Sequence, residues 1–292
     1  MKKLLALLMA MALVLALAAC GGTAEETTAA EDTTAEAVSV EVPENPVIRI
    51  STTTSVNDSG LLPAILPVFE SKTGYTVEVQ SAGTGAAIQK AKDGNADLIL
   101  VHSKASEEEF VNEGYGVERI PFMFNFFVVV GPKDDPAGIA DSANAAEAFN
   151  KIKESGSKFI SRGDDSGTHK AELKIWGDAA PDAATDTWYI SAGQGMGACL
   201  TMANEQNAYC LTDKATFLSN KADLDLEIIL AEGDDMKNTY SLIECNPEKL
   251  DGINTEGAKA LIEWLTGDEA SALIAKYGEE QYGEALFYLI EE

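Results

Sequence analysis

A ten-residue segment near the middle of the chain combines the residue types that bind small anions. It spans residues 161–170 and reads SRGDDSGTHK. The Arg162 guanidinium can make two charge-assisted hydrogen bonds to a tetrahedral oxyanion, and Asp164 can hold that guanidinium in place. Hydroxyl and backbone N–H donors follow at the start of a predicted helix, from Ser166, Gly167 and Thr168. The competing interpretation is a helix cap with a surface ion pair.

Two other hydroxyl-rich segments follow predicted strands. The run TTTS at 52–55 follows the strand predicted over 47–50, and its candidate anion-binding residues are Thr53, Thr54 and Ser55. The run SAGTG at 81–85 follows the strand predicted over 76–80, and Thr84 is its candidate donor. Hydroxyl groups and helix N-termini both donate hydrogen bonds, which suits oxyanion oxygens. A polar helix cap in the first case and an ordinary tight turn in the second remain as alternatives.

Other glycines and both histidines allow different interpretations. Residues 191–197 (SAGQGMG) precede another predicted helix, where they can add N–H donors or let that helix approach closely. His169 lies three residues after Ser166, which on a helix places them on one face and raises the alternative of a secreted serine hydrolase. The Gly-x-Ser-x-Gly elbow is missing from this sequence, which argues against catalysis. His102 ends a predicted strand and is expected to be a capping or core residue.

The elements around these segments predict an α/β fold. Residues 47–101 alternate strand, helix, strand, helix and strand, which implies parallel strands with helices on the faces. Ligands of such sheets bind beyond the carboxyl ends of the strands, where all three hydroxyl-rich segments fall. A long apolar strand over 121–131 is followed by GPKDDP, and a second α/β set comes after it.

We therefore expect two lobes, each a mainly parallel sheet flanked by helices, joined by two crossing strands. The first lobe is predicted to comprise 46–130 and 242–292, and the second lobe 131–241. The helix over 61–69 is expected to be capped by Asp58 or Ser59, with Pro63 in its first turn.

Charge and composition exclude several classes of function. The chain has 48 acidic and 21 basic residues and a formal net charge of −27, which excludes nucleic acid as a partner. The four cysteines have no zinc-ligand spacing, so we predict neither a metal site nor a cofactor. Cys199, Cys210 and Cys245 are compatible with one disulfide or with buried free thiols. Salt screens charge beyond about 8–10 Å, so anion capture must rely on local dipoles and a buried arginine.

The N-terminus predicts export and lipid anchoring. Lys2 and Lys3 precede an apolar run over 4–19, which ends in LAACG at 17–21. This resembles the bacterial lipobox, so residues 1–19 are predicted to be a lipoprotein signal peptide and Cys20 the lipidated residue. Residues 20–45 are acidic and contain no base, as expected of a disordered tether. A plain signal peptide with an incidental cysteine is the alternative.

Four motifs together carry a family resemblance. The pattern Arg-x-Asp-x-Ser-Gly-Thr at 162–168 resembles the anion loop of periplasmic phosphate-binding proteins. With TTTS at 52–55, GPKDDPA at 131–137 and SRGDDSGTH at 161–169, the chain resembles tungstate ABC transporter substrate-binding proteins over most of 47–290. The resemblance implies a type II two-lobed fold that closes on tungstate and hands it to a membrane permease. It also implies anion contacts at Thr54, Ser55, Thr84 and Arg162.

The resemblance has one departure and leaves the choice of anion open. Phe126 stands where the family pattern has an aspartate, which puts in doubt any role of that position in closure. Tungstate carries no proton at neutral pH, so its site should contain donors only. We therefore expect Asp58, Asp164 and Asp165 to stay out of direct contact with the anion. Phosphate, which is partly protonated and needs an acceptor, remains an alternative ligand, as do molybdate and sulfate.

Overall fold

The computed structural model describes residues 41–231 and 233–290, which form a mixed α/β fold of two lobes. The predicted signal peptide, Cys20 and the tether up to residue 40 lie outside the described residues. Among the described residues, no helix is both long enough and apolar enough to cross a bilayer. Cys199, Cys210 and Cys245 are buried free thiols.

The first lobe is built on strands in the order β2-β1-β3-β9-β4, and β10 pairs with β4 at the far edge. β1 is parallel to β2 and β3, whereas β9 is antiparallel to β3 and β4. The sheet is therefore parallel among β2, β1 and β3, where the predicted β-α-β units lie. It is antiparallel at β9, on which the chain returns from the second lobe. Its strands are β1 (Val47–Thr53), β2 (Thr76–Ala82), β3 (Leu98–Val101), β4 (Ile120–Gly131), β9 (Lys237–Glu244) and β10 (Tyr288–Leu289).

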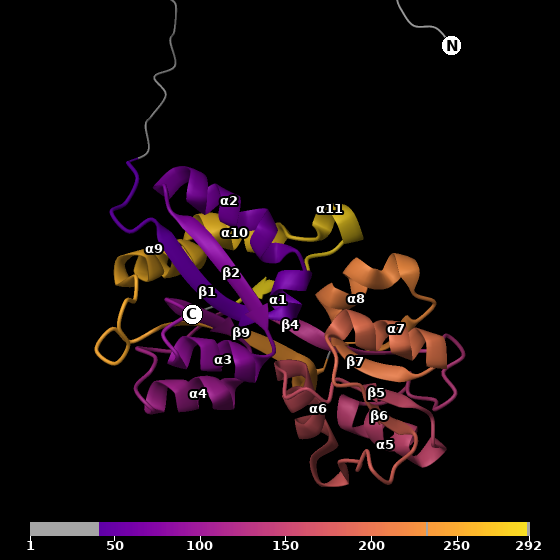
Figure 1. Cartoon of the computed structure of the whole chain (residues 1–292). Helices are drawn as coiled ribbons and strands as arrows, with labels where there is room; N and C mark the ends of the chain where they lie inside the picture. Colours follow the sequence, from indigo (N-terminus) through magenta and orange to yellow (C-terminus); the bar gives the residue numbers. More distant parts are fainter. Residues whose placement is uncertain (1–40, 232, 291–292) are drawn as a thin grey trace, which may run out of the picture. The chain divides into compact units, whose positions relative to one another are not determined.

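Helices cover both faces of this sheet (Figure 1). One face carries α2 (Leu61–Thr73), α9 (Thr255–Thr266) and α10 (Asp268–Lys276), and the other carries α3 (Thr84–Lys92) and α4 (Lys104–Asn112). The apolar stripe of α9, with Leu261 and Leu265 buried, faces the sheet as its helical spacing predicts. The short helices α1 (Thr54–Asp58) and α11 (Glu279–Tyr282) complete the lobe.

The second lobe is also a sheet with helices on both faces. Its strands pair in the order β4-β7-β5-β6, with β8 also on β4. The helices α7 and α8 lie over one side and α5 and α6 over the other (Figure 1). Its elements are α5 (Ala145–Ser155), β5 (Phe159–Ser161), α6 (Gly167–Trp176), η1 (Gly177–Ala179), β6 (Tyr189–Ser191), α7 (Met196–Gln206), β7 (Tyr209–Asp213), α8 (Lys214–Asn220), η2 (Lys221–Asp223), β8 (Glu227–Ala231) and η3 (Asp234–Met236).

The chain crosses between the lobes twice. The first part of β4 pairs with β9 and the second part with β7 and β8, so this 12-residue strand belongs to both lobes. The return crossing lies between β8 and β9. Val128 to Val130, in the part of β4 that pairs with β7 and β8, are fully buried, as expected for a strand covered on both faces.

Two local predictions need correction. The chain returns to the first lobe earlier than the predicted boundary at residue 242, because β9 already pairs with β4 at Lys237. The predicted cap of α2 is wrong, since the N-cap is Gly60 at φ +81° rather than Asp58 or Ser59. The reason is that residues 54–58 form the separate helix α1, and only glycine readily adopts the left-handed conformation between the two helices.

Candidate functional site

The three hydroxyl-rich segments lie at the carboxyl ends of β1, β2 and β5 and continue directly into α1, α3 and α6. The segments of the two lobes face one another. A Cβ atom added to Gly83 in the first lobe would lie 4.0 Å from Ser166 Cα in the second, and one added to Gly85 would lie 3.1 Å from a carboxylate oxygen of Asp165. The structure thus brings together residues predicted from segments about 80 positions apart.

In the first segment, only part of the TTTS run is available for a ligand. Thr52 donates its hydroxyl hydrogen to Leu100 O at 2.7 Å, within the sheet. Thr53 and Ser55 are buried, and their hydroxyl oxygens lie 3.1 Å apart. Thr54 lies between them and is half-buried. These three residues are the predicted candidates, and they cluster where β1 ends.

The second segment contains a buried hydroxyl without a partner. Thr84 is the first residue of α3 and is fully buried, and its Oγ1 has no hydrogen-bond partner among the described residues. The N-cap residue Gly83 supplies no side-chain oxygen to the first turn, whose N–H groups have no partner within the helix. An unpaired buried hydroxyl destabilises a fold, so its presence beside uncapped N–H groups is typical of a ligand contact.

Arg162 occupies the centre of the third segment. Its side chain is only 3% exposed, its Nε donates to Gln194 O at 2.8 Å, and its Nη2 donates to Asp164 Oδ2 at 2.5 Å. A guanidinium has five N–H donors, so these two bonds orient the group while leaving others for a ligand. The guanidinium is thus held inside the protein rather than in bulk water.

The start of α6 supplies the remaining predicted donors. Ser166 is the N-cap, its Oγ accepts from His169 N at 3.2 Å, and its own N–H donates to Asp164 Oδ1 at 3.1 Å. The N–H and the hydroxyl of Ser166 thus both bond the Asp164 carboxylate in this structure. Gly167 and Thr168 are buried and begin the helix, so their N–H groups belong to the turn that has no acceptor within α6.

The contacts of His169 do not support the hydrolase alternative. Its Nδ1 accepts from the Asp165 backbone N–H at 3.1 Å, while the Ser166 hydroxyl oxygen accepts from the His169 backbone. Both side chains are thus bonded to backbone groups, which is helix capping rather than a nucleophile paired with a base.

The carboxylates near the site are already engaged or exposed. Asp164 accepts from Arg162 and Ser166, and these bonds outweigh the effect of burial and hold its pKa below 3.8. Asp165 is 75% exposed and lies 3.5 Å from Lys170 Nζ, and Asp58 is exposed. Among residues 41–231 and 233–290, no group of three or more His, Cys, Asp or Glu side chains could hold a metal ion.

His102 was expected to be a core or capping residue, and it is buried but also touches the site. Its Nε2 lies 3.2 Å from Ser55 Oγ, and its Nδ1 lies 2.8 Å from Asn238 Oδ1. Burial lowers the pKa of His102 to about 4. The hydrogen bond to Asn238 opposes this shift, and the nearby positive charge of Arg162 adds to it. The imidazole is therefore neutral at pH 7. Only its position after β3, next to the other strand ends, could have indicated this contact from the sequence.

Gln194 was also missed as an individual residue. The glycine-rich run 191–197 does reach the site, but through the Gln194 carbonyl that accepts from Arg162. Gly163, at φ +59°, lies against this run, because a Cβ there would come within 1.9 Å of Ser191 Oγ. Within this run it is thus the Gln194 carbonyl that positions the arginine, as an acceptor, a role different from the two that were predicted.

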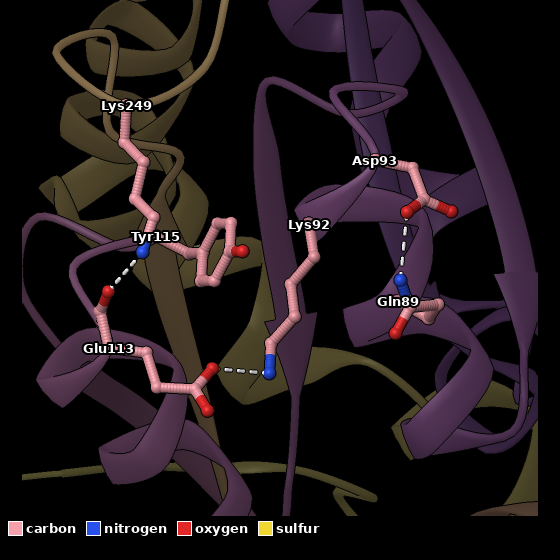
Figure 2. Close-up of a pocket in the computed structure, with 6 residues that line it drawn as sticks. All are labelled: Gln89, Lys92, Asp93, Glu113, Tyr115 and Lys249. Carbon is pink, nitrogen blue, oxygen red and sulfur yellow. Dashed lines mark hydrogen bonds and ion pairs between the residues drawn. The ribbon is translucent and has the colours of Figure 1, made fainter.

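A separate open groove of about 500 Å³ lies on the first lobe. Figure 2 shows that its two ammonium groups already have partners: Lys92 Nζ lies 2.5 Å from the Glu113 carboxylate, and Lys249 donates to the Glu113 carbonyl. The groove is a poor anion site, because the charges of Lys92 and Lys249 are balanced by the carboxylates of Asp93 and Glu113 in the same lining. It is lined by Gln89, Lys92, Asp93, Glu113, Tyr115 and Lys249.

Comparisons with known proteins identify the family of this chain. A family model described as the PBP superfamily domain matches residues 22–269. The chain is 46% identical over 290 residues to the tungstate-binding protein TupA of Peptoclostridium acidaminophilum, covering 98% of each chain. A crystal structure of the tungstate ABC transporter from Geobacter sulfurreducens is 44% identical with a TM-score of 0.73, covering 79% of this chain and 98% of that one. The tungstate-binding protein TupA of Desulfovibrio alaskensis G20 is 33% identical with a TM-score of 0.73, covering 85% and 100%.

Proposed function

This chain belongs to the PBP superfamily and, within it, to the family of tungstate-binding proteins of ABC transporters, and from this we propose that it binds tungstate outside the cytoplasm and delivers it to an ABC permease. Members of this family bind solutes and are not enzymes. The proposal is thus a binding function without catalysis.

The observation that carries the proposal is the meeting of hydrogen-bond donors from both lobes around a buried arginine. The unpaired hydroxyl of Thr84 and the first turn of α3 face the loop of Arg162, which is fixed by Asp164 and Gln194. The donors proposed to contact the anion are Thr53, Thr54, Ser55, Thr84, Arg162, Ser166, Gly167 and Thr168.

The chemistry of this donor set favours a fully deprotonated dianion. Tungstate at neutral pH only accepts hydrogen bonds, and hydroxyl, N–H and guanidinium groups all can donate. Both oxygens of Asp164 already accept hydrogen bonds, from Arg162 and Ser166, which makes this carboxylate a weaker acceptor for a hydrogen bond from a ligand. A ligand held by donors on both lobes bridges them, which stabilises the closed arrangement that a permease recognises.

Competition calorimetry with tungstate, molybdate, sulfate and phosphate tests the ligand. We expect tungstate to bind most tightly, and native mass spectrometry of the complex to show the mass of one tungstate per chain. Tighter binding of phosphate or sulfate would overturn the choice of tungstate while keeping an oxyanion-binding protein. Absence of binding for all four anions would overturn the function itself.

Lipid anchoring through Cys20 is a second part of the proposal. It is supported by the LAACG sequence at 17–21 after the apolar run, and by the acidic segment that follows. In a bacterial host, we expect the full chain to incorporate labelled palmitate and to sediment with membranes. Cys20→Ser should abolish both, whereas Thr23→Ala, three residues away, should change neither. Label in the Cys20→Ser variant would overturn the anchor.

The division into lobes is part of the same proposal. We assign residues 46–130 and 242–292 to the first lobe and 131–241 to the second, with closure about the two crossings. Within β4 the pairing changes from β9 to β7 after Phe126, which supports a first crossing inside this strand, a few residues before the assigned boundary. Because β9 pairs with β4 from Lys237 onward, the second crossing is better set just before that strand, which moves residues 237–241 from the second lobe to the first.

A further inference from the structure

A buried chain of hydrogen bonds leads from the proposed anion site to the strands that connect the lobes. We call it the His102 network, and it consists of Ser55, His102, Asn238, Asn125 and Tyr240. Asn125 on β4 and Asn238 on β9 are directly opposite in the sheet register. His102 is the member that contacts both the site and these strands.

The network determines which nitrogen of His102 carries the proton. Asn238 Nδ2 donates to Asn125 Oδ1 at 2.9 Å and to the Tyr240 hydroxyl oxygen at 2.8 Å, so its carbonyl Oδ1 is the atom that faces His102. An acceptor at 2.8 Å requires a hydrogen on His102 Nδ1. In the neutral ring, Nε2 is then an acceptor.

This tautomer fixes the position of Ser55. Because Nε2 can only accept, the 3.2 Å contact requires the Ser55 hydroxyl to donate to His102. The Ser55 oxygen can in turn accept from the Thr53 hydroxyl, 3.1 Å away. In this arrangement Ser55 offers an anion its backbone N–H at the start of α1 rather than its hydroxyl. The side chains at the end of β1 are therefore tied to β9 through one imidazole ring.

The same ring is in contact with the second lobe. A Cβ atom added to Gly167, the first residue of α6, would lie 2.5 Å from His102 Cε1 and 2.9 Å from both ring nitrogens. Gly167 does not have a positive φ, so its backbone conformation does not require glycine. What requires glycine there is the close approach of α6 to the ring.

From these contacts we propose that His102 is a positioning residue for the anion site, which orients Ser55 in the first lobe and forms the surface on which Gly167 of the second lobe closes. This rests on the proposed function, because it assumes that the two lobes close on an oxyanion. No direct contact between His102 and the anion is implied. The ring determines how closely the donors of the two lobes approach one another and how they are aligned.

Substitution at Gly167 tests the contact between the lobes. Gly167→Ala places a methyl group against the ring, so we expect about tenfold weaker tungstate binding in calorimetry. Small-angle X-ray scattering should also show that the ligand-induced compaction of the wild type is lost. The matched control is Gly197→Ala in the first turn of α7, where an added Cβ has only Asn220 Oδ1 nearby, at 3.8 Å, and binding should be unchanged.

Making space at position 102 distinguishes this contact from a general effect on α6. In a His102→Ala background the methyl group of Gly167→Ala has room, so the second substitution should change affinity by less than about twofold. His102→Gln, which keeps a carbonyl acceptor for Ser55, should retain more affinity than His102→Asn, which is too short to reach it.

Wild-type binding is measured first, so that the two proposals can fail separately. If the wild type binds none of the anions, the proposed function fails. If the wild type binds and Gly167→Ala binds equally well, or loses the same factor in both backgrounds, the role of His102 is wrong. Thermal unfolding of each variant shows that a loss of affinity is not a loss of folded protein.

Discussion

Arg162 Nη2 and Asp164 Oδ2 lie 2.5 Å apart, in a pair formed by two residues of the same loop. With the bond from Arg162 Nε to Gln194 O at 2.8 Å, this pair fixes the plane of a guanidinium that is nearly inaccessible to solvent. Preorganising the donor in this way reduces the conformational entropy lost when a ligand binds. The site therefore depends on the shape of the arginine fork as well as on its charge.

Replacing Arg162 by lysine tests that dependence. Lysine keeps the charge, but one ammonium cannot maintain the bonds to Gln194 and Asp164 and also contact the anion. We expect calorimetry to show about 10–100-fold weaker tungstate binding, which corresponds to one or two charge-assisted hydrogen bonds. Arg49→Lys is the matched control, because Arg49 is paired with Asp97 in the first lobe and should not affect affinity. Equal affinity of Arg162→Lys and wild type would contradict the assignment.

Thr84→Val separates ligand binding from stability. The Thr84 hydroxyl has no partner among the described residues, so valine of similar shape should leave the melting temperature of the ligand-free protein unchanged or raise it. Binding should become about tenfold weaker, because one hydrogen bond to a charged group is lost. Differential scanning calorimetry and titration calorimetry measure the two effects.

The control for Thr84 is Thr52, whose hydroxyl donates to Leu100 O at 2.7 Å. Thr52→Val leaves that buried carbonyl with one hydrogen bond fewer, so it should lower stability by about 1–3 kcal/mol and leave affinity unchanged. A reversed pattern, with Thr84 governing stability and Thr52 governing affinity, would show that the ligand occupies a different position.

The local features of the site could be predicted from the sequence because strand, loop and helix signals are all local. The runs at 52–55, 81–85 and 161–168 do lie where strands end and helices begin, although β1 and β2 extend into the first two residues of their runs. Thr84 and Arg162 were identified by residue type and by position at helix starts, and both are buried where the lobes meet. Parallel strand order then places such loops at one edge of each sheet.

The partners of these residues could not be predicted, because they come from distant parts of the chain. His102 contacts Asn238, 136 positions away, and no local pattern specifies that pairing. Short elements such as α1 and α8 were also missed, since five or seven residues give too little periodicity to distinguish a helix from a polar loop.

Phe126 illustrates how the pleat of a strand decides the importance of a substitution. It lies on β4 beside Asn125, and successive side chains of a strand point to opposite faces. Asn125 joins the His102 network, whereas Phe126 stacks edge-on against Phe124 and Tyr288 at 5.7 and 5.9 Å. The departure from the family pattern is therefore on the face of β4 away from the His102 network.

Glu172 should make the stability of this protein depend on pH. This residue of α6 is 1% exposed, and burial raises its pKa from 4.5 to about 7. Its hydrogen bonds oppose this shift, and they include those from Tyr189 OH at 2.7 Å and Trp176 Nε1 at 3.3 Å. Between these two pH values the folded protein holds a proton at this site that the unfolded chain has released. The free energy of unfolding must therefore fall as pH rises from about 4.5 to 7.

Glu172→Gln removes this titration while keeping the oxygen that accepts from Tyr189 and Trp176. Since one pKa unit corresponds to about 1.4 kcal/mol, wild type should lose about 3 kcal/mol relative to this variant between pH 4.5 and 8, measured by urea unfolding. Glu147→Gln on α5 is the control, because hydrogen bonds from Ala143 and Lys151 lower that pKa from its ordinary value, so this carboxyl is ionised in the folded and the unfolded chain above about pH 5.5. Its stability difference from wild type should be constant from pH 5.5 to 8. If the free energies of unfolding of wild type and Glu172→Gln changed in parallel with pH, the Glu172 pKa would lie near its ordinary value. Its carboxylate would then stay charged beside Tyr189 at neutral pH.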